Sequence, residues 1–490
     1  YRDDFLNTML WHEGHEDALM TPGCPDCKTP GESSVYCCKE CFFDELVCNV
    51  CCVHHHTRLP FHCTEQWTGQ QFEPVSLVSL GLQIQLNHSS DEYNACLRPK
   101  PGPLKFTIIH INSLHYINII VCGCSQSNDC GIINQLLHCG LFPVTVQPPQ
   151  TCATFQLLHH FHLQSVQSKV STIHFYQALE RETDNSGLMD IKFHYSSFLC
   201  MVCIWRHLKL LKQGGHGHDP LGAEGMRRGE LALVCPACLI PSMNLPDGWW
   251  EDLSKWHVAI DMHSRYVLPL TINLSPHSYL YMKITSQDAN FHLSLCNKGI
   301  HDPGLGTRWA YFIEEQAYHE YLANCGKQTE TSTCTSLSAI DQANSKNSRG
   351  LQVTGVGAVV CAHHGFLQPT GIGDLQKGEW QVFMHVFTLY ANMDYILFSG
   401  LQGSNLWDFL NMYDIWCMYY KNLKTQHEQL TPSLQFNFDT MTFNGAIQKF
   451  HLNTHGESCQ MRFSLNYLPG VRHTDGDGIE CDWSSVNAAA

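Results

Sequence analysis

The closely spaced cysteine pairs near the N-terminus constrain the fold of this chain more than any other feature. Three C-x2-C pairs fall within 28 residues, and two spaced histidines follow them. In order, these residues are Cys24 and Cys27, Cys38 and Cys41, Cys48 and Cys51, then His56 and His62. A C-x2-C turn places two thiolates on one side of a metal ion, and structural zinc takes four thiolate or imidazole ligands. The pattern therefore predicts two structural zinc sites. A segment this short buries little core, so metal affinity, on the order of 10 kcal/mol, would supply most of its folding energy.

The pairing of these ligands stays open at the level of sequence. Alternating use would give a cross-brace, with one site of Cys24, Cys27, Cys48 and Cys51 and another of Cys38, Cys41, His56 and His62. Neighbouring pairs can also close sequentially. Four nearby residues of the same types compete as ligands: Cys37, Cys52, His54 and His55. A set of buried free cysteines is the alternative to metal binding, and a ubiquitin-ligase-like cross-brace is an alternative role.

Composition narrows the class of protein. The chain has 490 residues, which predicts two or three domains. Its 26 Cys accompany 31 His, and because disulfide frameworks do not need histidine, the mixture favours zinc in a reducing, intracellular compartment. The net charge of −16 argues against holding nucleic acid by bulk attraction, although a local basic groove remains compatible with it. We expect no membrane span, because uncharged apolar runs of about 18 residues are missing, and no leading signal segment.

A second cysteine group is less regular. His88, Cys96, Cys122 and Cys124, with Cys130 and Cys139 nearby, would either hold a third zinc ion or be ordinary core cysteines. The pair "VCGC" follows a predicted hairpin of residues 106–111 and 116–121 that turns at 112–113. Cys235 and Cys238 form one more half-site, for which the sequence indicates no partners.

Beyond the cysteines, the apolar spacing predicts helices over 151–213. Glycine-rich residues 212–230 and polar residues 328–349 read as loops. Two strand-like runs lead to or contain an acidic residue, Asp288 in the first and Asp414 in the second. Four more acids lie close together near the end of the sequence: Asp475, Asp477, Glu480 and Asp482. Two acids on strands and one on a late helix are the arrangement that a two-metal phosphoryl-transfer site needs. The alternatives are a turn acid at Asp288, a helix cap at Asp414 and acids favoured by a helix dipole at the end.

Histidines and cysteines late in the chain suggest one further cluster. His364, His451, His455 and Cys459, with Cys361 nearby, would form a metal or structural group. His451, His455 and Cys459 are spaced by four, which would place them on one helix face. Ordinary core or surface histidines are the alternative.

Several longer motifs, in this order, resemble the KDZ (Kyakuja, Dileera and Zisupton) transposases, mobile elements expanded in fungi. They are "CPACLIPSMNLPDGW", "DANFHL", "VVCAHHGFLQPTGIGDLQKGE", "NMDYI", "YDIWC", "FHLNTHGESC" and "FSLNYLPGVRHTDGDGIE". The front half, with "YCCKECFFDELVCNVCCVHHHTRLPFH" and "GLFPVTVQPPQTCATFQLL", resembles the cysteine-cluster domain associated with them. The resemblance implies an α/β chain in three parts: a zinc-binding cysteine cluster over 1–66, the rest of the cysteine-cluster domain over 67–230, and an RNase H-like transposase domain over 231–490 that ends before the family's C-terminal helical region.

The resemblance also implies an activity, cleavage and transfer of DNA strands by a carboxylate triad with Mg2+ or Mn2+. By position, Asp288 and Asp414 would be the strand ligands. The third acid would be Glu480, whose spacing before Trp483 is similar to that of the late glutamate in hAT transposases, with Asp477 as second choice. The implied partners are transposon ends and target DNA, the implied compartment is the nucleus, and protein partners at the zinc cluster and oligomers are open.

The chain departs from the family where arginine is usual. His292, His363, Trp380 and Cys481 occupy such positions, and "DGDGIEC" replaces a pattern close to DGEGIER. His or Cys cannot reproduce the planar fork with which arginine holds phosphate. We therefore expect a degenerate or inactive copy. The alternative is a zinc-dependent DNA- or protein-binding scaffold without catalysis, and wide separation of the three acids would favour it.

Overall fold

The structure is a computed structural model, and the residues it describes exclude several segments. The described ranges are 1–14, 23–29, 35–42, 45–88, 96–124, 131–241, 243–245, 247–249, 281–299, 304–306, 308–325, 350–375, 387–468, 470–471 and 474–488. The predicted loop over 328–349, Cys130 and Trp380 lie outside them.

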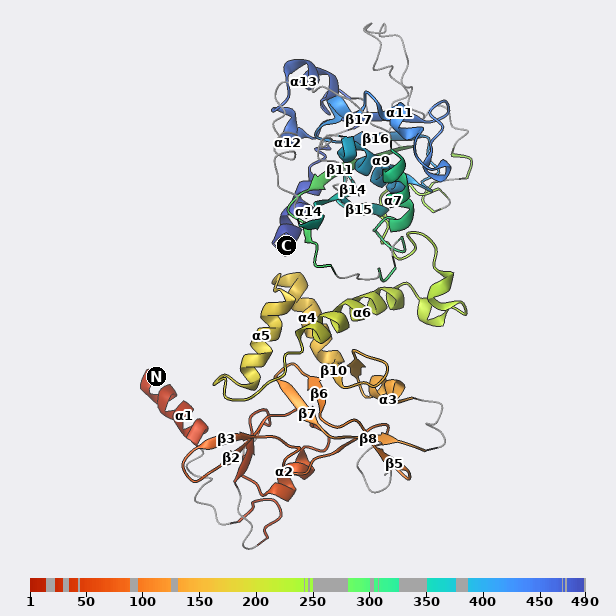
Figure 1. Ribbon diagram of the computed structural model, residues 1–490. Coiled ribbons are helices and arrows are strands. Elements are labelled where there is room, and N and C mark those ends of the chain that lie inside the picture. Colours follow the sequence, from red (N-terminus) through yellow and green to blue (C-terminus); the bar gives the residue numbers. More distant parts are fainter. Residues whose placement is uncertain are drawn as a thin grey trace. The chain divides into compact units, whose positions relative to one another are not determined.

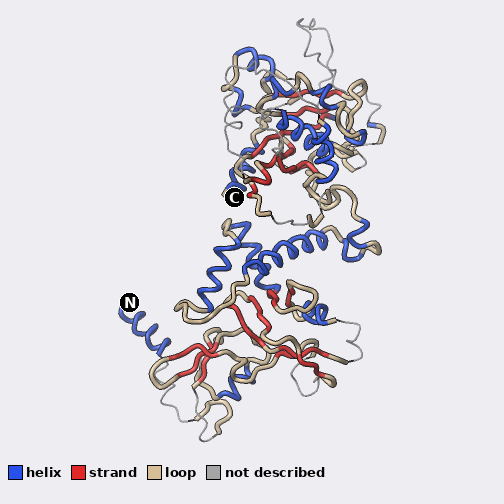
Figure 2. The backbone as a smooth tube through the Cα atoms, viewed as in Figure 1, coloured by secondary structure: helices blue, strands red, loops and turns tan. Residues whose placement is uncertain are grey.

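The chain forms two compact units, Tyr1–Leu208 and Lys209–Ala490 (Figures 1 and 2). The division falls inside helix α6 (Tyr195–Gln213), within the last predicted helical region. The finer division at residues 66 and 230 stays a prediction. In the described part of the chain, no helix combines the length and the hydropathy needed to cross a bilayer.

The first unit contains several small sheets, and their strands are only two to four residues long. One sheet has the order β1-β2-β3, one β4-β8-β5 and one β7-β6-β10-β9. The strands are β1 (Tyr36–Cys38), β2 (Thr64–Trp67), β3 (Phe72–Val75), β4 (Ile84–Gln85), β5 (Pro99–Pro101), β6 (Phe106–Ile109), β7 (Leu114–Ile117), β8 (Ile119–Cys122), β9 (Leu141–Pro143) and β10 (Thr151–Thr154).

The predicted hairpin is confirmed in part. Strands β6 and β7 pair antiparallel, with Ile109 opposite Leu114. The second predicted strand does not run unbroken, because it divides at Asn118 and β8 pairs with β4 and β5 in a different sheet. Cys122 at the end of β8 is thereby carried away from the hairpin.

The helices of the first unit are α1 (Arg2–Gly14), α2 (Asn49–His55), α3 (Ile132–His138), α4 (Phe155–Gln167), α5 (Thr172–Thr183) and α6. The helical prediction for 151–213 is confirmed except for its start. Residues Thr151–Thr154 form strand β10, and the Thr154 side chain then caps α4 by accepting a hydrogen bond from the Leu157 N–H. Phe161, Tyr176 and Phe198, one from each of α4 to α6, pack together in the core.

A five-stranded mixed sheet organises the second unit. Its order is β15-β14-β11-β16-β17: β14 pairs antiparallel with β15 and β11, whereas β11, β16 and β17 are parallel. The strands are β11 (Met282–Asn290), β14 (Gly355–Cys361), β15 (Leu367–Leu375), β16 (Asp408–Met412) and β17 (Thr442–Ala446). The strand predictions around Asp288 and before Asp414 are confirmed. A further pair, β12 (Leu295–Cys296) with β13 (Leu351–Val353), lies apart from this sheet.

Helices cover both faces of the large sheet. The α-helices described in this unit after α6 are α7 (Glu315–Asn324), α9 (Phe387–Leu401), α10 (Trp416–Tyr419), α11 (Leu423–His427), α12 (Lys449–Leu452), α13 (Glu457–Phe463) and α14 (Gly478–Asn487), and α9 and α14 cover opposite faces of the sheet. Because side chains alternate along a strand, Val359 of β14 packs with Ile396 of α9. Its neighbours Ala358 and Val360 face the other way and pack with Ile479 and Trp483 of α14. Figure 1 shows α14 beside the ends of β11 and β14.

Candidate functional site

The sheet register brings Asp288 and Asp414 to the same edge. Parallel strands β11 and β16 are paired up to Ser286 opposite Met412. Asp288 lies two residues beyond Ser286, and Asp414 lies two residues beyond Met412. The carboxyl ends of neighbouring parallel strands thus present two acids side by side, at the position where ligands of open α/β sheets commonly bind.

Helix α14 carries Glu480 to the same place. Asp288 pairs with Ala358 across β11 and β14, so its side chain lies on the face that α14 covers. The indole Nε1–H of Trp483 donates a hydrogen bond of 2.8 Å to Asp288 Oδ2. Trp483 lies one helical turn after Glu480. Helix α14 therefore carries both Glu480 and the hydrogen-bond partner of Asp288. Trp483 is also a core residue, since its ring is buried against β14.

The three acids influence one another electrostatically. Burial raises the pKa of Asp288 well above its usual range, and the charges of Asp414 and Glu480 raise it further. Burial also raises the pKa of Asp414, with Glu480 adding to the shift and the nearby His451 opposing it. Each acid nevertheless keeps part of its side chain exposed. A buried carboxylate whose pKa is raised further by neighbouring acids lies in a site that favours positive charge.

His451 is a member of this site that the sequence did not identify. Its Nε2 lies 2.8 Å from Glu480 Oε1, and this contact is the main cause of its raised pKa. His451 lies in α12, which follows the neighbouring parallel strand β17. The proposed cluster of His364, His451, His455 and Cys459 is wrong as one group, because His451 binds Glu480 and the other residues divide between two cysteine clusters.

Asp477 and Asp475 lie at the start of α14 rather than in the acid cluster. The Phe450 N–H donates 3.3 Å to Asp477 Oδ1, and the Asp477 N–H donates 3.2 Å to Asp475 Oδ1. Burial raises the pKa of Asp477, and the hydrogen bond from the Phe450 N–H partly opposes this shift. Asp477 therefore connects α12 to the start of α14, while Glu480 faces the two strand acids.

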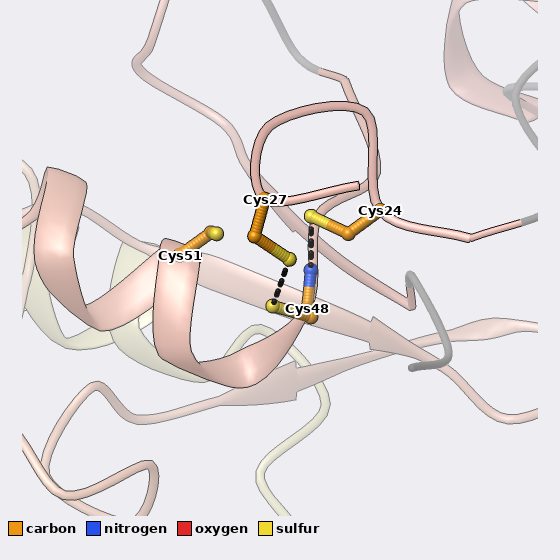
Figure 3. Close-up of side chains that lie close together, drawn as sticks. All are labelled: Cys24, Cys27, Cys48 and Cys51. Carbon is orange, nitrogen blue, oxygen red and sulfur yellow. Dashed lines mark hydrogen bonds between the residues drawn. The ribbon is translucent and has the colours of Figure 1, made fainter. Parts of the chain in front are cut away.

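The N-terminal ligands gather in two groups that alternate along the chain. Cys24, Cys27, Cys48 and Cys51 form one, and Figure 3 shows their side chains pointing toward one centre. Cys27 and Cys48 have sulfurs 3.8 Å apart. Two sulfurs on a tetrahedral zinc ion stand about 3.8 Å apart, and a sulfur and a nitrogen about 3.5 Å, from the usual Zn–S and Zn–N bond lengths. The group therefore can hold zinc in the alternating, cross-brace arrangement.

Cys38, Cys41, His56 and His62 form the second group. Cys38 Sγ lies 3.3 Å from His62 Nδ1, and Cys41 Sγ lies 3.6 Å from His56 Nε2. His56 Nδ1 lies 2.7 Å from the Cys52 carbonyl oxygen, which can only accept. The proton is therefore on Nδ1, and Nε2 is left with the lone pair that a metal needs.

A third group joins His88, Cys96, Cys122 and Cys124. The distances are 3.1 Å from His88 Nε2 to Cys122 Sγ and 3.7 Å between the sulfurs of Cys96 and Cys124. The break between β7 and β8 allows this group, because β8 carries Cys122 toward Cys96. Cys139 is exposed at the end of α3 and is not in the group.

Two cysteine groups in the second unit were not predicted as such. Cys235 and Cys238 meet Cys361, and Cys417 meets His455 and Cys459. The predicted single helix face for His451, His455 and Cys459 is wrong, because α12 ends at Leu452 and Cys459 belongs to α13. Cys417 was missed altogether, since it lies far from its partners in sequence and has no C-x2-C neighbour.

These features define an α/β domain with clustered acids at parallel strand ends, preceded by cysteine groups that can hold zinc. Residues 281–490 match the family model of the Kyakuja-Dileera-Zisupton transposase, and residues 77–187 match that of the CxC2 like cysteine cluster associated with KDZ transposases. The chain therefore carries a KDZ transposase domain and its associated cysteine cluster domain, and the resemblance seen in the motifs is confirmed. The two alternating groups lie before the residues matched by the cluster model. Searches of curated proteins and of solved structures found no match.

Proposed function

We propose that the second unit has an RNase H-like fold and descends from an enzyme that cuts DNA at transposon ends and joins it to a target. The observation that carries this proposal is that Asp288 lies close enough to Asp414 and Glu480 for their charges to add to the effect of burial on its pKa. One acid lies near the end of β11, one follows the neighbouring parallel strand β16 and the third comes from a late helix, as the family resemblance implies. The sheet order supports the fold, with β11 at its centre, antiparallel strands on one side and parallel strands on the other.

The chemistry of the three acids suits Mg2+ or Mn2+, although their oxygens do not all lie within 4.8 Å of one another as the ligand atoms of the cysteine groups do. Hard divalent cations prefer carboxylate oxygens. The charges of Asp414 and Glu480 add to burial in raising the pKa of Asp288, and bound cations would relieve this. Such ions, when bound, would activate the attacking oxygen and stabilise the leaving oxygen. Asp288 and Asp414 would supply the ligands from the sheet and Glu480 would complete them. Trp483 would orient Asp288, and His451 would orient Glu480.

We infer that this copy is degenerate. His292 follows β11 four residues after Asp288, Cys481 stands directly after Glu480, and both replace residues that are usually arginine in the family. DNA phosphates beside the acids would thus meet fewer guanidinium groups, so affinity for DNA would fall while the fold persists. The net charge of −16 would add to this loss.

A second function is favoured by the three cysteine groups of the first unit. These groups can hold zinc independently of the acids, so the chain would act in the nucleus as a zinc-dependent scaffold that binds transposon DNA or protein partners, alone or as an oligomer. This role does not require catalysis.

The test is nicking of terminal-repeat DNA by the purified, zinc-loaded full chain with Mg2+ or Mn2+, beside Asp288→Ala and Asp414→Ala. Nicking by the wild type that both variants lose supports the enzyme. Nicking that persists in both variants overturns the triad. A folded wild type that binds the DNA without nicking it supports the scaffold.

A further inference from the structure

The half-site of Cys235 and Cys238 finds its partners 123 residues later in the sequence. Cys238 Sγ lies 3.2 Å from Cys361 Sγ, and the sulfurs of all three cysteines lie within 4.8 Å of one another. His364 lies beside this group. Its Nδ1 is 3.4 Å from Cys235 Sγ and 3.7 Å from Cys361 Sγ, whereas it does not come within 4.8 Å of all three sulfurs. The two nitrogen-to-sulfur distances bracket the value of about 3.5 Å expected around tetrahedral zinc.

Both halves of the group are built as rigid turns. In the first, the Cys238 N–H donates to the Cys235 carbonyl at 3.2 Å, and the Asn244 side-chain amide donates to the Cys238 carbonyl at 2.6 Å. In the second, the Cys361 N–H donates to Phe366 at 2.7 Å, and the Gly365 N–H donates back to Cys361 at 2.9 Å. Gly365 has a φ of +68°, which favours glycine and closes the turn that carries His364.

A disulfide or a set of plain core cysteines accounts less well for this group than a metal site does. A disulfide between Cys238 and Cys361 would need sulfurs about 2.0 Å apart. Plain core cysteines need no histidine, yet His364 is exposed and still directs its Nδ1 toward two buried thiols, those of Cys235 and Cys361. Three thiols and an imidazole are a donor set that zinc prefers and that Mg2+ and Ca2+ do not.

The group is next to the helix that carries Glu480. A Cβ placed on Gly365 would lie 3.5 Å from Asp482 Oδ2, and a Cβ placed on Gly478 would lie 3.8 Å from Gly365 Cα. The turn over 361–366 therefore packs directly on the first turns of α14. Cys361 also pairs with Thr285 of β11, three residues before Asp288.

We propose that Cys235, Cys238, Cys361 and His364 form a structural zinc site that ties the segment before β11 to the 361–366 turn and so holds α14 in place. The binding of zinc is independent of the proposed function. The placement of Glu480 matters only if the proposed function holds, because a shifted α14 would move that acid away from Asp288 and Asp414.

The first test counts zinc in the full chain by mass spectrometry of metals. Cys361→Ser and His364→Ala are expected to hold one zinc ion fewer per chain than the wild type. Cys296→Ser, at an exposed cysteine outside the metal groups of the described residues, is the control and should keep the wild-type count. His363→Ala distinguishes the fourth ligand and should also keep that count, because the exposed His363 side chain interacts with Cys361 but is not the proposed ligand. An unchanged count in Cys361→Ser and His364→Ala overturns the site, and a loss in His363→Ala as large as that in His364→Ala overturns the fourth ligand.

A second measurement needs no variant and so does not depend on the folding of one. Alkylation of the folded wild type, mapped by peptide mass spectrometry, should leave the partly exposed Cys238 protected until a chelator removes zinc, while exposed Cys296 reacts at once. Protection that a chelator does not change would overturn zinc binding.

Hydrogen exchange of the backbone over 478–487 tests whether the zinc site holds α14 in place. It reports on this part of the proposal without any measurement of DNA cleavage. His364→Ala should speed exchange there at least several-fold, and His363→Ala should not. Loss of zinc without faster exchange overturns the positioning of α14. Both readouts remain valid in a chain that does not nick DNA, so their failure is distinct from failure of the proposed function.

Discussion

Trp483 donates a hydrogen bond of 2.8 Å from its indole nitrogen to Asp288 Oδ2, across 195 residues of sequence. One helix thus carries both the partner of the first acid and, one turn earlier, Glu480. The geometry of the acid cluster therefore depends on how α14 docks on β11 and β14. That docking is apolar, since Ile479 and Trp483 bury themselves against Ala358 and Val360.

Replacement of the indole tests this link. Trp483→Phe keeps most of the buried ring and removes the donor, so Asp288 loses its orientation while α14 stays docked. We expect DNA nicking to fall about tenfold, with a loss of unfolding free energy of about 1–2 kcal/mol. Nicking rates and thermal denaturation check this. Trp407→Phe, at a half-exposed indole away from the acids, is the control and should change neither. Nicking equal to wild type in Trp483→Phe would refute the orienting role.

Neutral replacements of Glu480 and Asp477, both at the start of α14, distinguish which of them is the third acid of the triad. Glu480→Gln should lower nicking at least 100-fold, because Glu480 lies among the charges of Asp288 and Asp414. Asp477→Asn should lower it only a few-fold, because Asp477 accepts a hydrogen bond from the Phe450 N–H at the helix start. Exposed Asp475→Asn is the charge-matched control. Equal losses in the two test variants would restore Asp477 as a candidate ligand.

Zinc removal should affect the first unit strongly. Cys48→Ser removes one of four ligands from the group in Figure 3, and the short strands around it bury too little apolar surface to fold without metal. We expect loss of one zinc ion per chain and of the folded structure around Cys24 and Cys48, measured by metal analysis and by hydrogen exchange of residues 35–62. Exposed Cys139→Ser should retain both. Full zinc content in Cys48→Ser would contradict the assigned ligand.

Asp394 predicts a pH dependence of stability. It is buried in α9, and burial raises its pKa to about 7, with the nearby Tyr419 hydroxyl opposing the shift. The unfolded pKa is near 4, so the native state binds the extra proton and stability falls as pH rises from about 4 to 7. Asp394→Asn should therefore raise the melting temperature at pH 8 and change it little at pH 4. Exposed Asp439→Asn is the control. A melting temperature of Asp394→Asn that is not raised at pH 8 would contradict the shift.

Local spacing in the sequence determined much of this protein. The C-x2-C pairs and spaced histidines named eight residues that gather in two groups, because a turn of four residues brings its own thiols together whatever the rest of the chain does. The strands that lead to Asp288 and Asp414 and the helices of the first unit also follow from local periodicity. The family motifs are also local stretches of sequence, and they were enough to indicate the KDZ resemblance.

Only the tertiary structure decided which distant residues meet. Strand register placed Asp288 beside Asp414, and the docking of α14 brought Glu480 and Trp483 to them. His451 paired with Glu480 rather than with His455, because α12 ends at Leu452 and the two histidines do not share a helix. Cys235 and Cys238 gained Cys361 and His364 through the packing of segments that lie far apart in the chain. Such contacts depend on how sheets and helices pack across more than a hundred residues, and local spacing carries no record of that packing.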